Sequence, residues 1–240
     1  MRILVTGGAS GLGEAITRRL AKELGNVLFI TYHRSKKNAE IIEKDLSNVH
    51  SIYCDFCNSN DIQNLQRQMI DMQLDVLINN AYVGEYSHTH FHNISREVFL
   101  NDFTNSVVPT IAITQTAIQE FRKRKKGNIV TILTSFLFSS TPIGSAVYLA
   151  NKAYLAKLSQ VWALENVKFN ICSNTVSPSF MLTNAGKNID ERLIELMKDA
   201  HPIKKLLTAD EAAESVMTLI INTQNLNGFN LIVNSAKDVV

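Results

Sequence analysis

The sequence is poor in cysteine, and three cysteines in 240 residues do not make a disulfide framework. Cys54 and Cys57 form an isolated CxxC pair with no second pair beside it, so we interpret them as two thiols at a strand end rather than as a metal or redox site. A low cysteine content is typical of a reducing compartment, and we therefore expect the protein to be cytoplasmic.

Long apolar runs and a charge excess of either sign are also absent. No hydrophobic stretch is long enough to cross a bilayer, and the first strand starts too near Met1 to leave room for a signal peptide. The 24 Lys and Arg residues nearly balance the 22 Asp and Glu residues, and a net charge of +2 gives no argument for nucleic acid binding. Without repeats, low-complexity segments or linkers, residues 1–240 are expected to form a single domain with no membrane or nucleic acid partner.

Apolar, strand-like segments alternate with segments of helical periodicity. We expect strands at 2–6, 27–32, 49–54, 75–78, 128–134, 167–176 and 229–233, and helices at 14–24, 38–46, 62–72, 95–100, 105–125, 147–165, 190–200 and 210–222. Pro109 either kinks its helix or marks the first turn. The alternation predicts an α/β fold, a Rossmann-type doubly wound parallel sheet of about seven strands with helices on both faces.

Glycines separate the first strand from the first helix. The turn reads Gly7-Gly8-Ala9-Ser10-Gly11-Leu12-Gly13. A strand, a glycine-rich turn and a helix form the context of a phosphate-binding loop, because glycine lets the backbone approach a pyrophosphate and the helix N-terminus offers free N–H groups. The alternative is a glycine-rich turn that binds nothing.

Basic residues follow the second strand, where an NAD site usually has an acidic residue for the ribose 2′-hydroxyl. His33 and Arg34 would suit a 2′-phosphate, so we expect NADP(H) to be preferred over NAD(H), unless these charges only solvate a turn. After the third strand, Asp55 either accepts a hydrogen bond from the adenine amino group or caps the helix that starts near Asn58.

Two further patterns concern chemistry directly. His88, His90 and His92 alternate along a polar loop, but no carboxylate or cysteine shares their spacing, so we expect no metal site. Tyr148 and Lys152 are four residues apart, which places both on one face of a helix. An ammonium beside a phenol favours the phenolate, so this tyrosine can exchange a proton with a carbonyl or an alcohol, although the pair alone also fits an ordinary helix surface.

Taken in order, these motifs resemble the short-chain dehydrogenase/reductase family along essentially the whole chain. The resemblance rests on Thr6-Gly7-xxx-Gly11-x-Gly13, Asp55, Asn79-Asn80-Ala81, Asn105-xxx-Pro109, Ser135, Tyr148, Lys152, Asn174-xxx-Pro178 and Thr183.

The resemblance implies a role for each of these positions. Tyr148 would be the general acid in reduction, Lys152 would hold the nicotinamide ribose, Ser135 would bind the substrate oxygen, and Asn105 would support a water-mediated proton relay. Cofactor contacts would come from Gly7, Ser10, Gly11, Leu12, Gly13, His33, Arg34, Asp55, Asn79, Ala81, Tyr148, Lys152, Pro178 and Thr183.

Four residues depart from the family pattern. Tyr82, Ser179, Ser235 and Ala236 stand where the family usually has glycine. Tyr82 is expected to narrow the cofactor pocket or to change how the nicotinamide sits. Ser179 is expected to restrict the backbone of its turn.

Within the family, the sequence is most similar to 3-oxoacyl-carrier-protein reductases and related ketoreductases, which implies reduction of a small-molecule or carrier-bound ketone to a secondary alcohol. The apolar residues Phe136, Phe138, Ile143, Phe180 and Met181 suit an acyl or polyketide-like chain. Two other functions remain open: a sugar or sugar-nucleotide reductase in surface-polysaccharide biosynthesis, and a catalytically inactive scaffold.

Two expectations concern partners. The basic run from Arg122 to Lys126 is either a solvated helix end or a docking patch for an acidic carrier protein. The family resemblance also implies a homodimer or homotetramer formed through the helices at 105–125 and 147–165.

Overall fold

The computed structural model describes residues 1–84, 89–139, 141–181, 191–199, 201–221 and 225–237. Within these ranges, no helix combines the length and the apolarity that crossing a membrane requires.

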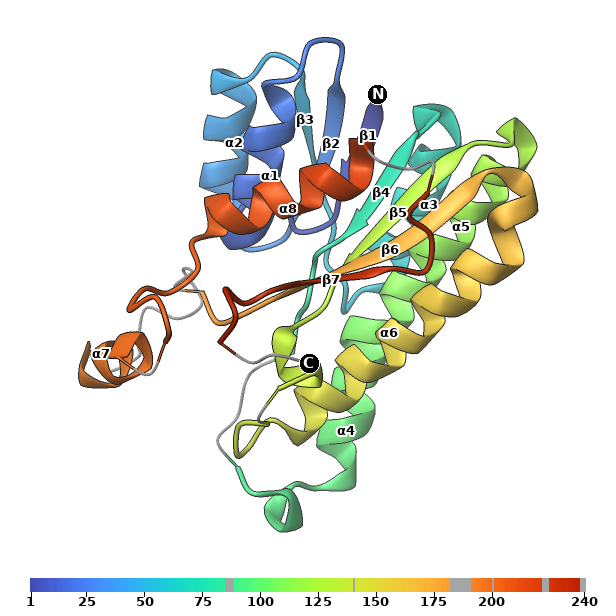
Figure 1. The fold of residues 1–240 in the computed structure, drawn as a ribbon. Coiled ribbons are helices and arrows are strands. Elements are labelled where there is room, and N and C mark those ends of the chain that lie inside the picture. Colours follow the sequence, from blue (N-terminus) through green and yellow to red (C-terminus); the bar gives the residue numbers. More distant parts are fainter. Residues whose placement is uncertain (85–88, 140, 182–190, 200, 222–224, 238–240) are drawn as a thin grey trace.

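Seven strands of the described chain form one sheet, in which every pairing is parallel (Figure 1). The strands are β1 (Arg2–Val5), β2 (Val27–Tyr32), β3 (Val49–Tyr53), β4 (Val76–Asn79), β5 (Gly127–Ile132), β6 (Ile171–Pro178) and β7 (Asn230–Val233). Their order is β3-β2-β1-β4-β5-β6-β7, so the direction of winding reverses between β1 and β4. This confirms the predicted doubly wound sheet, and in such sheets ligands bind beyond the carboxyl ends of the strands at the reversal.

Helices cover both faces of this sheet. The α-helices of the described chain are α1 (Gly11–Ala21), α2 (Lys36–Asp45), α3 (Ser59–Met72), α4 (Arg96–Asp102), α5 (Val108–Arg124), α6 (Ala146–Asn166), α7 (Glu191–Asp199) and α8 (Ala209–Ile221). Alternate residues of β1 face opposite sides: Ile3 and Val5 join the core under α1, α2 and α8, and Leu4 joins the core under α3, α5 and α6. Figure 1 shows α7 standing apart from these layers.

The start of the sixth strand differs from the prediction. Val167–Phe169 extends α6 as a 3-10 turn, and Asn170 then adopts a left-handed backbone with φ 54°, so β6 begins only at Ile171. Val167 and Phe169 suit a strand by residue type, but the reversal at Asn170 places them before the sheet. Pro109 lies in the first turn of α5, which was one of the two positions expected for it, the other being a kink within the helix.

Between α4 and α5 the chain forms a π-helical turn at Phe103–Val107. Such wide turns occur mostly as single turns inside longer helices and often at functional sites. Asn105, one of the predicted catalytic residues, lies in the middle of this turn.

Three of the four residues that stand where the family usually has glycine differ in their backbone conformation. Ser235 and Ala236 keep a left-handed backbone, with φ 49° and 59°, which side chains rarely adopt. Ser179 is not among the residues with positive φ, and its N–H donates to the Val233 carbonyl, so the expected restriction at Ser179 does not arise.

Candidate active site

The glycine loop joins β1 to α1 through two left-handed glycines, Gly7 with φ 64° and Gly11 with φ 54°. At Gly13, a Cβ atom would lie 2.1 Å from the Gly7 carbonyl oxygen, so only glycine allows the helix to come this close. Ser10 is extended before the helix and makes no side-chain cap hydrogen bond, which leaves N–H groups of the first helical turn for a ligand. This cradle fits the pyrophosphate of a dinucleotide.

Asn80 and Thr6 hold the glycine loop in place from the neighbouring strand end. The Asn80 amide donates to the carbonyl oxygens of Thr6 (2.9 Å) and Gly7 (3.2 Å). The Thr6 hydroxyl accepts hydrogen bonds from the N–H groups of Asn80 and Ala81. Asn80 was not singled out from the sequence, although it is the middle residue of the Asn79-Asn80-Ala81 motif.

Asn79 was predicted to contact the cofactor, but its side chain points into the protein interior. Its amide donates to the hydroxyls of Thr114 (2.9 Å) and Thr131 (3.4 Å), and the residue is buried. The Asn79 side chain thus ties β4 to α5 and β5, while Ala81 remains at the loop.

His33 and Asp55, which were predicted to bind the adenosine part of the cofactor, lie close together. His33 Nε2 lies 3.6 Å from Asp55 Oδ2, and the N–H of Cys57 donates to Asp55 Oδ1. Asn58, not Asp55, caps α3, because its side chain accepts from the N–H of Asn60. The helix-cap interpretation of Asp55 is therefore wrong. Arg34 is exposed beside this pair.

Tyr148 and Lys152 lie on one face of α6, as their spacing predicts. Lys152 Nζ is 5.7 Å from the centroid of the Tyr148 ring and donates to the Ile132 carbonyl at the end of β5 (2.8 Å). Lys152 is only 4% exposed, and burial lowers its pKa to about 8, against the raising effect of the Asp102 charge. A lysine that titrates so near neutrality, next to a phenol, can relay a proton at working pH.

The other two predicted catalytic residues lie in turns that contact α6. Ser135, 2% exposed, begins a 3-10 turn (Ser135–Leu137) that is separated from the end of β5 by two residues, and Thr134 caps this turn by accepting from the N–H of Phe136. Both this turn and the π-helical turn of Asn105 pack against α6. The structure therefore brings the elements that carry all four residues together around one helix.

Tyr82 reaches into the same site. Its ring centroid is 5.2 Å from that of Tyr148, edge to face, and 5.0 Å from Lys152 Nζ. The Tyr82 hydroxyl donates to Asp102 Oδ1 (2.7 Å), and the Asn151 amide donates to the same oxygen (2.7 Å). Asp102 and Asn151 were missed in the sequence, because neither belongs to a recognisable motif.

The remaining predicted residues lie away from the Tyr148–Lys152 pair or outside the described chain. Pro178 ends β6 and is buried, whereas Thr183 and His88 lie outside the described residues. His90 and His92 are exposed, and no group of three or more metal-ligating side chains occurs in the described chain. Cys54 is a buried free thiol whose pKa is raised to about 12 by burial and nearby carboxylates, so it is not a reactive thiolate.

The basic run Arg122–Lys126 lies at the other end of the molecule. It comprises the last three residues of α5 and the two residues before β5, whereas the site lies beyond the carboxyl ends of the strands. Arg122 donates to Asn166, Arg124 to the Leu74 carbonyl and Lys126 to Asp75. Most of these cations thus serve the fold, and their position does not support a docking patch beside the site.

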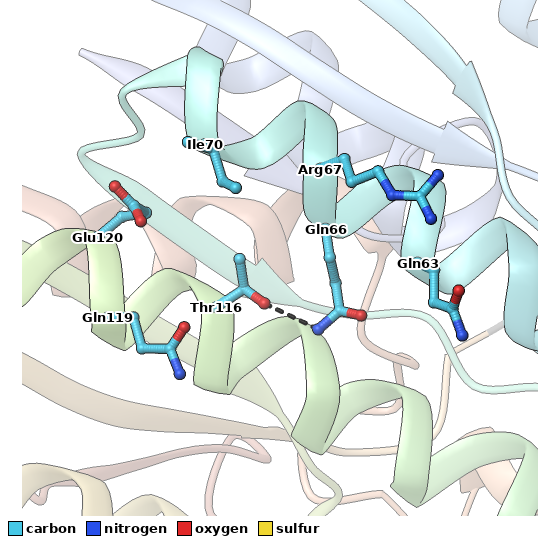
Figure 2. Close-up of a pocket in the computed structure, with 7 residues that line it drawn as sticks. All are labelled: Gln63, Gln66, Arg67, Ile70, Thr116, Gln119 and Glu120. Carbon is cyan, nitrogen blue, oxygen red and sulfur yellow. Dashed lines mark hydrogen bonds between the residues drawn. The ribbon is translucent and has the colours of Figure 1, made fainter.

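A shallow cleft between α3 and α5 also lies apart from the site (Figure 2). Gln66 crosses it and donates to the Thr116 hydroxyl (2.8 Å) and the Ala112 carbonyl (3.1 Å). None of the predicted catalytic or cofactor-binding residues lines it, so we assign the cleft to helix packing.

Known proteins resemble this chain over most of its length. The family model described as enoyl-(acyl carrier protein) reductase matches residues 7–235. Carbonyl reductase (NADPH) 2 of Sus scrofa is 23% identical over 223 residues, which are 92% of this chain and 88% of that protein. The 3-oxoacyl-(acyl-carrier-protein) reductase FabG of Aquifex aeolicus (strain VF5) is 25% identical over 223 residues, 90% of this chain and 88% of that protein.

A solved structure described as a short chain dehydrogenase/reductase family protein superposes with a TM-score of 0.84. It is 28% identical and covers 98% of this chain and 96% of its own.

Proposed function

Because the chain belongs to the short-chain dehydrogenase/reductase family of NAD(P)-dependent oxidoreductases, we propose that it reduces a 3-oxoacyl thioester to the 3-hydroxyacyl product with NADPH. The observation that carries the proposal is the pair on α6: a buried lysine with a pKa of about 8 lies against the ring of Tyr148. The name of the Aquifex aeolicus relative supports a 3-oxoacyl substrate, and that of the Sus scrofa relative supports NADPH.

We assign the cofactor to the residues that the sequence indicated. The N–H groups at the start of α1, opened by Gly7, Gly11 and Gly13, would hold the pyrophosphate, and His33 and Arg34 would face the 2′-phosphate. When bound, the cofactor supplies the hydride for the carbonyl carbon.

The proton comes from the chain itself. Tyr148 donates its hydroxyl proton to the carbonyl oxygen as that oxygen gains negative charge, and Ser135 donates a hydrogen bond to the same oxygen. Lys152 stabilises the tyrosinate that is left and returns a proton to it, and Asn105 supports the water that reprotonates Lys152. The products are a secondary alcohol and the oxidised cofactor, so electrons and protons balance.

Apolar side chains support an acyl substrate. Phe136 and Phe180, both half-buried, follow β5 and β6, and Met181 packs against the core below α8. Phe138 lines a small cleft with Ala156 of α6 and Phe229, and Ile143 is 71% exposed. We therefore assign the acyl-binding wall to fewer residues than the sequence analysis named, chiefly Phe136 and Phe180.

The remaining assignments extend this proposal. We treat residues 1–240 as a single domain, since one sheet contains strands from both ends of the chain. Exposed apolar side chains on α5 and α6 (Val108, Tyr154 and Leu164) support association into a homodimer or homotetramer. Free cysteines in the described chain agree with a cytoplasmic location.

The direct test is NADPH oxidation with a panel of ketones. We expect turnover with acetoacetyl-CoA and with 3-oxoacyl chains on a carrier protein, and none with nucleotide-linked keto sugars. Turnover with the keto sugars alone would favour the sugar-nucleotide reductase, and NADPH binding without turnover of any ketone would favour the scaffold.

The cofactor preference has its own test at Arg34, whose guanidinium is free to meet a 2′-phosphate at the exposed end of β2. Arg34→Ala should raise the Kd for NADPH about tenfold, because a charge-assisted contact with phosphate is lost, and should leave the Kd for NADH unchanged. Lys44→Ala, which removes an exposed cation from the last turn of α2, is the matched control. Equal weakening of both cofactors by Arg34→Ala would contradict the assignment.

A further inference from the structure

Asp102 joins three segments that are far apart in the sequence. It is the last residue of α4, and its Oδ1 accepts one hydrogen bond from Tyr82, after β4, and one from Asn151, in α6. Both distances are 2.7 Å, which is typical of bonds to a charged carboxylate. Asn151 directly precedes Lys152, so the carboxylate is tied to the helix that carries the reacting pair.

The chain leaves room for this carboxylate. A Cβ on Gly84 would lie 2.0 Å from Asp102 Oδ2, so any larger residue at 84 would force the two apart. The Gly84 N–H also donates to the hydroxyl of Ser106 (3.2 Å), in the π-helical turn. The backbone after β4 is thus fitted closely over Asp102, independently of the Tyr82 hydroxyl.

Through Tyr82, Asp102 reaches the reacting pair. The phenol that Asp102 holds covers the Lys152 ammonium with its ring face and meets the Tyr148 ring edge to face. Burial, the hydrogen bond to Asp102 and its negative charge raise the pKa of Tyr82 far above its usual value, so Tyr82 stays a neutral donor and Asp102 carries the charge.

The charge itself acts on Lys152. Among the described residues, the titratable groups near this ammonium are Asp102 from α4, Tyr82 from the segment after β4 and Tyr148 from its own helix, and the Ile132 carbonyl accepts its hydrogen bond. Burial favours the neutral amine, and Asp102 is the charge that opposes it. Without Asp102, the hydrogen bond to the Ile132 carbonyl and the Tyr82 ring would remain, but no negative charge would oppose the desolvation of Lys152.

We infer that Asp102 is a positioning residue of the active centre: it fixes the Tyr82 ring over the reacting pair and places a negative charge next to the turn of α6 that carries Lys152. The inference rests on the proposed function only for its meaning in catalysis, since the arrangement exists in the protein alone. Tyr82, which looked like a departure that narrows the pocket, becomes part of the proton-handling machinery.

The test measures Lys152 directly, without substrate or cofactor. The protein is labelled with 13Cε-lysine, and the Lys152 signal is identified as the one missing from Lys152→Met. In Asp102→Asn, which keeps the size and the acceptor oxygen, we expect the midpoint of the Lys152 titration to fall by about one pH unit. Asp71→Asn, which removes an exposed carboxylate from α3, should leave it in place.

Tyr82→Phe separates the charge from the hydroxyl. It keeps the ring and the charge of Asp102, so we expect a smaller change in the Lys152 midpoint but a several-fold lower kcat, because the ring loses its anchor. In the wild type, the alkaline limb of kcat/KM should follow the Lys152 midpoint, and Asp102→Asn should move both together.

A Lys152 midpoint that is the same in Asp102→Asn and the wild type would overturn the inference, as would a Tyr82→Phe shift as large as that of Asp102→Asn. If the proposed reduction fails instead, no ketone is turned over, while the shift between wild type and Asp102→Asn is still seen in the NMR titration.

Discussion

Replacement of Tyr148 by phenylalanine should lower kcat by about 10²–10⁴-fold, the usual contribution of a general acid. The variant keeps the ring that packs against Tyr82 and loses only the hydroxyl that donates the proton. Its affinity for NADPH, measured by fluorescence titration, should change little, because the glycine loop and Lys152, which would hold the pyrophosphate and the nicotinamide ribose, are unchanged.

The matched control is Tyr154→Phe, the same change six residues further along α6. Tyr154 is 45% exposed, and its ring packs against Phe103 rather than in the site. We expect full activity from this variant. A Tyr148→Phe enzyme as active as Tyr154→Phe would remove the general acid from the mechanism.

The buried ammonium of Lys152 should lower the free energy of unfolding of the protein substantially at neutral pH. Its folded-state pKa of about 8 lies below the 10.5 of an unfolded chain, so between these values the unfolded state binds more protons and stability rises with pH. Keeping the buried ammonium below pH 8 costs about 3 kcal/mol relative to the neutral amine. Lys152→Met removes this cost, because methionine has no charge to bury, and it also abolishes catalysis.

The measurement compares urea unfolding of the wild type and Lys152→Met at pH 7.5 and at pH 10.5. The free energy of unfolding of the wild type relative to the variant should increase by about 3 kcal/mol over this interval. Differences that do not depend on pH, such as the lost hydrogen bond to Ile132, cancel in the comparison. If the difference in free energy of unfolding stayed constant or fell with pH, burial would not be lowering the pKa of Lys152.

Much of the fold could be predicted because its determinants are local. Apolar runs of four to eight residues, a glycine turn at Gly7–Gly13 and helices of regular period are enough to indicate a parallel sheet with helices on both sides. The error at Val167–Phe169 is also local, since Val167 and Phe169 suit a strand by residue type, but the left-handed backbone of Asn170 separates them from the sheet.

The site was predictable to the extent that it consists of motifs. Tyr148, Lys152, Ser135 and Asn105 lie on elements that meet at α6. Asp102 and Asn151 could not be found in this way, because their significance depends on a hydrogen-bonded contact with Tyr82 that only the folded chain creates. Tyr82 itself was noticed, but as an obstacle to the cofactor rather than as a hydrogen-bonded member of the site.

The wide turn at Phe103–Val107 makes the length of this segment as important as its composition. A π-helical turn takes up one residue more than an α-turn, so loss of one residue here would restore regular winding and leave α4 and α5 nearly in register. The wide turn that carries Asn105 and packs against α6 would then be lost. Single-residue deletions between 103 and 107 are therefore expected to be tolerated by the helix but not by the active centre.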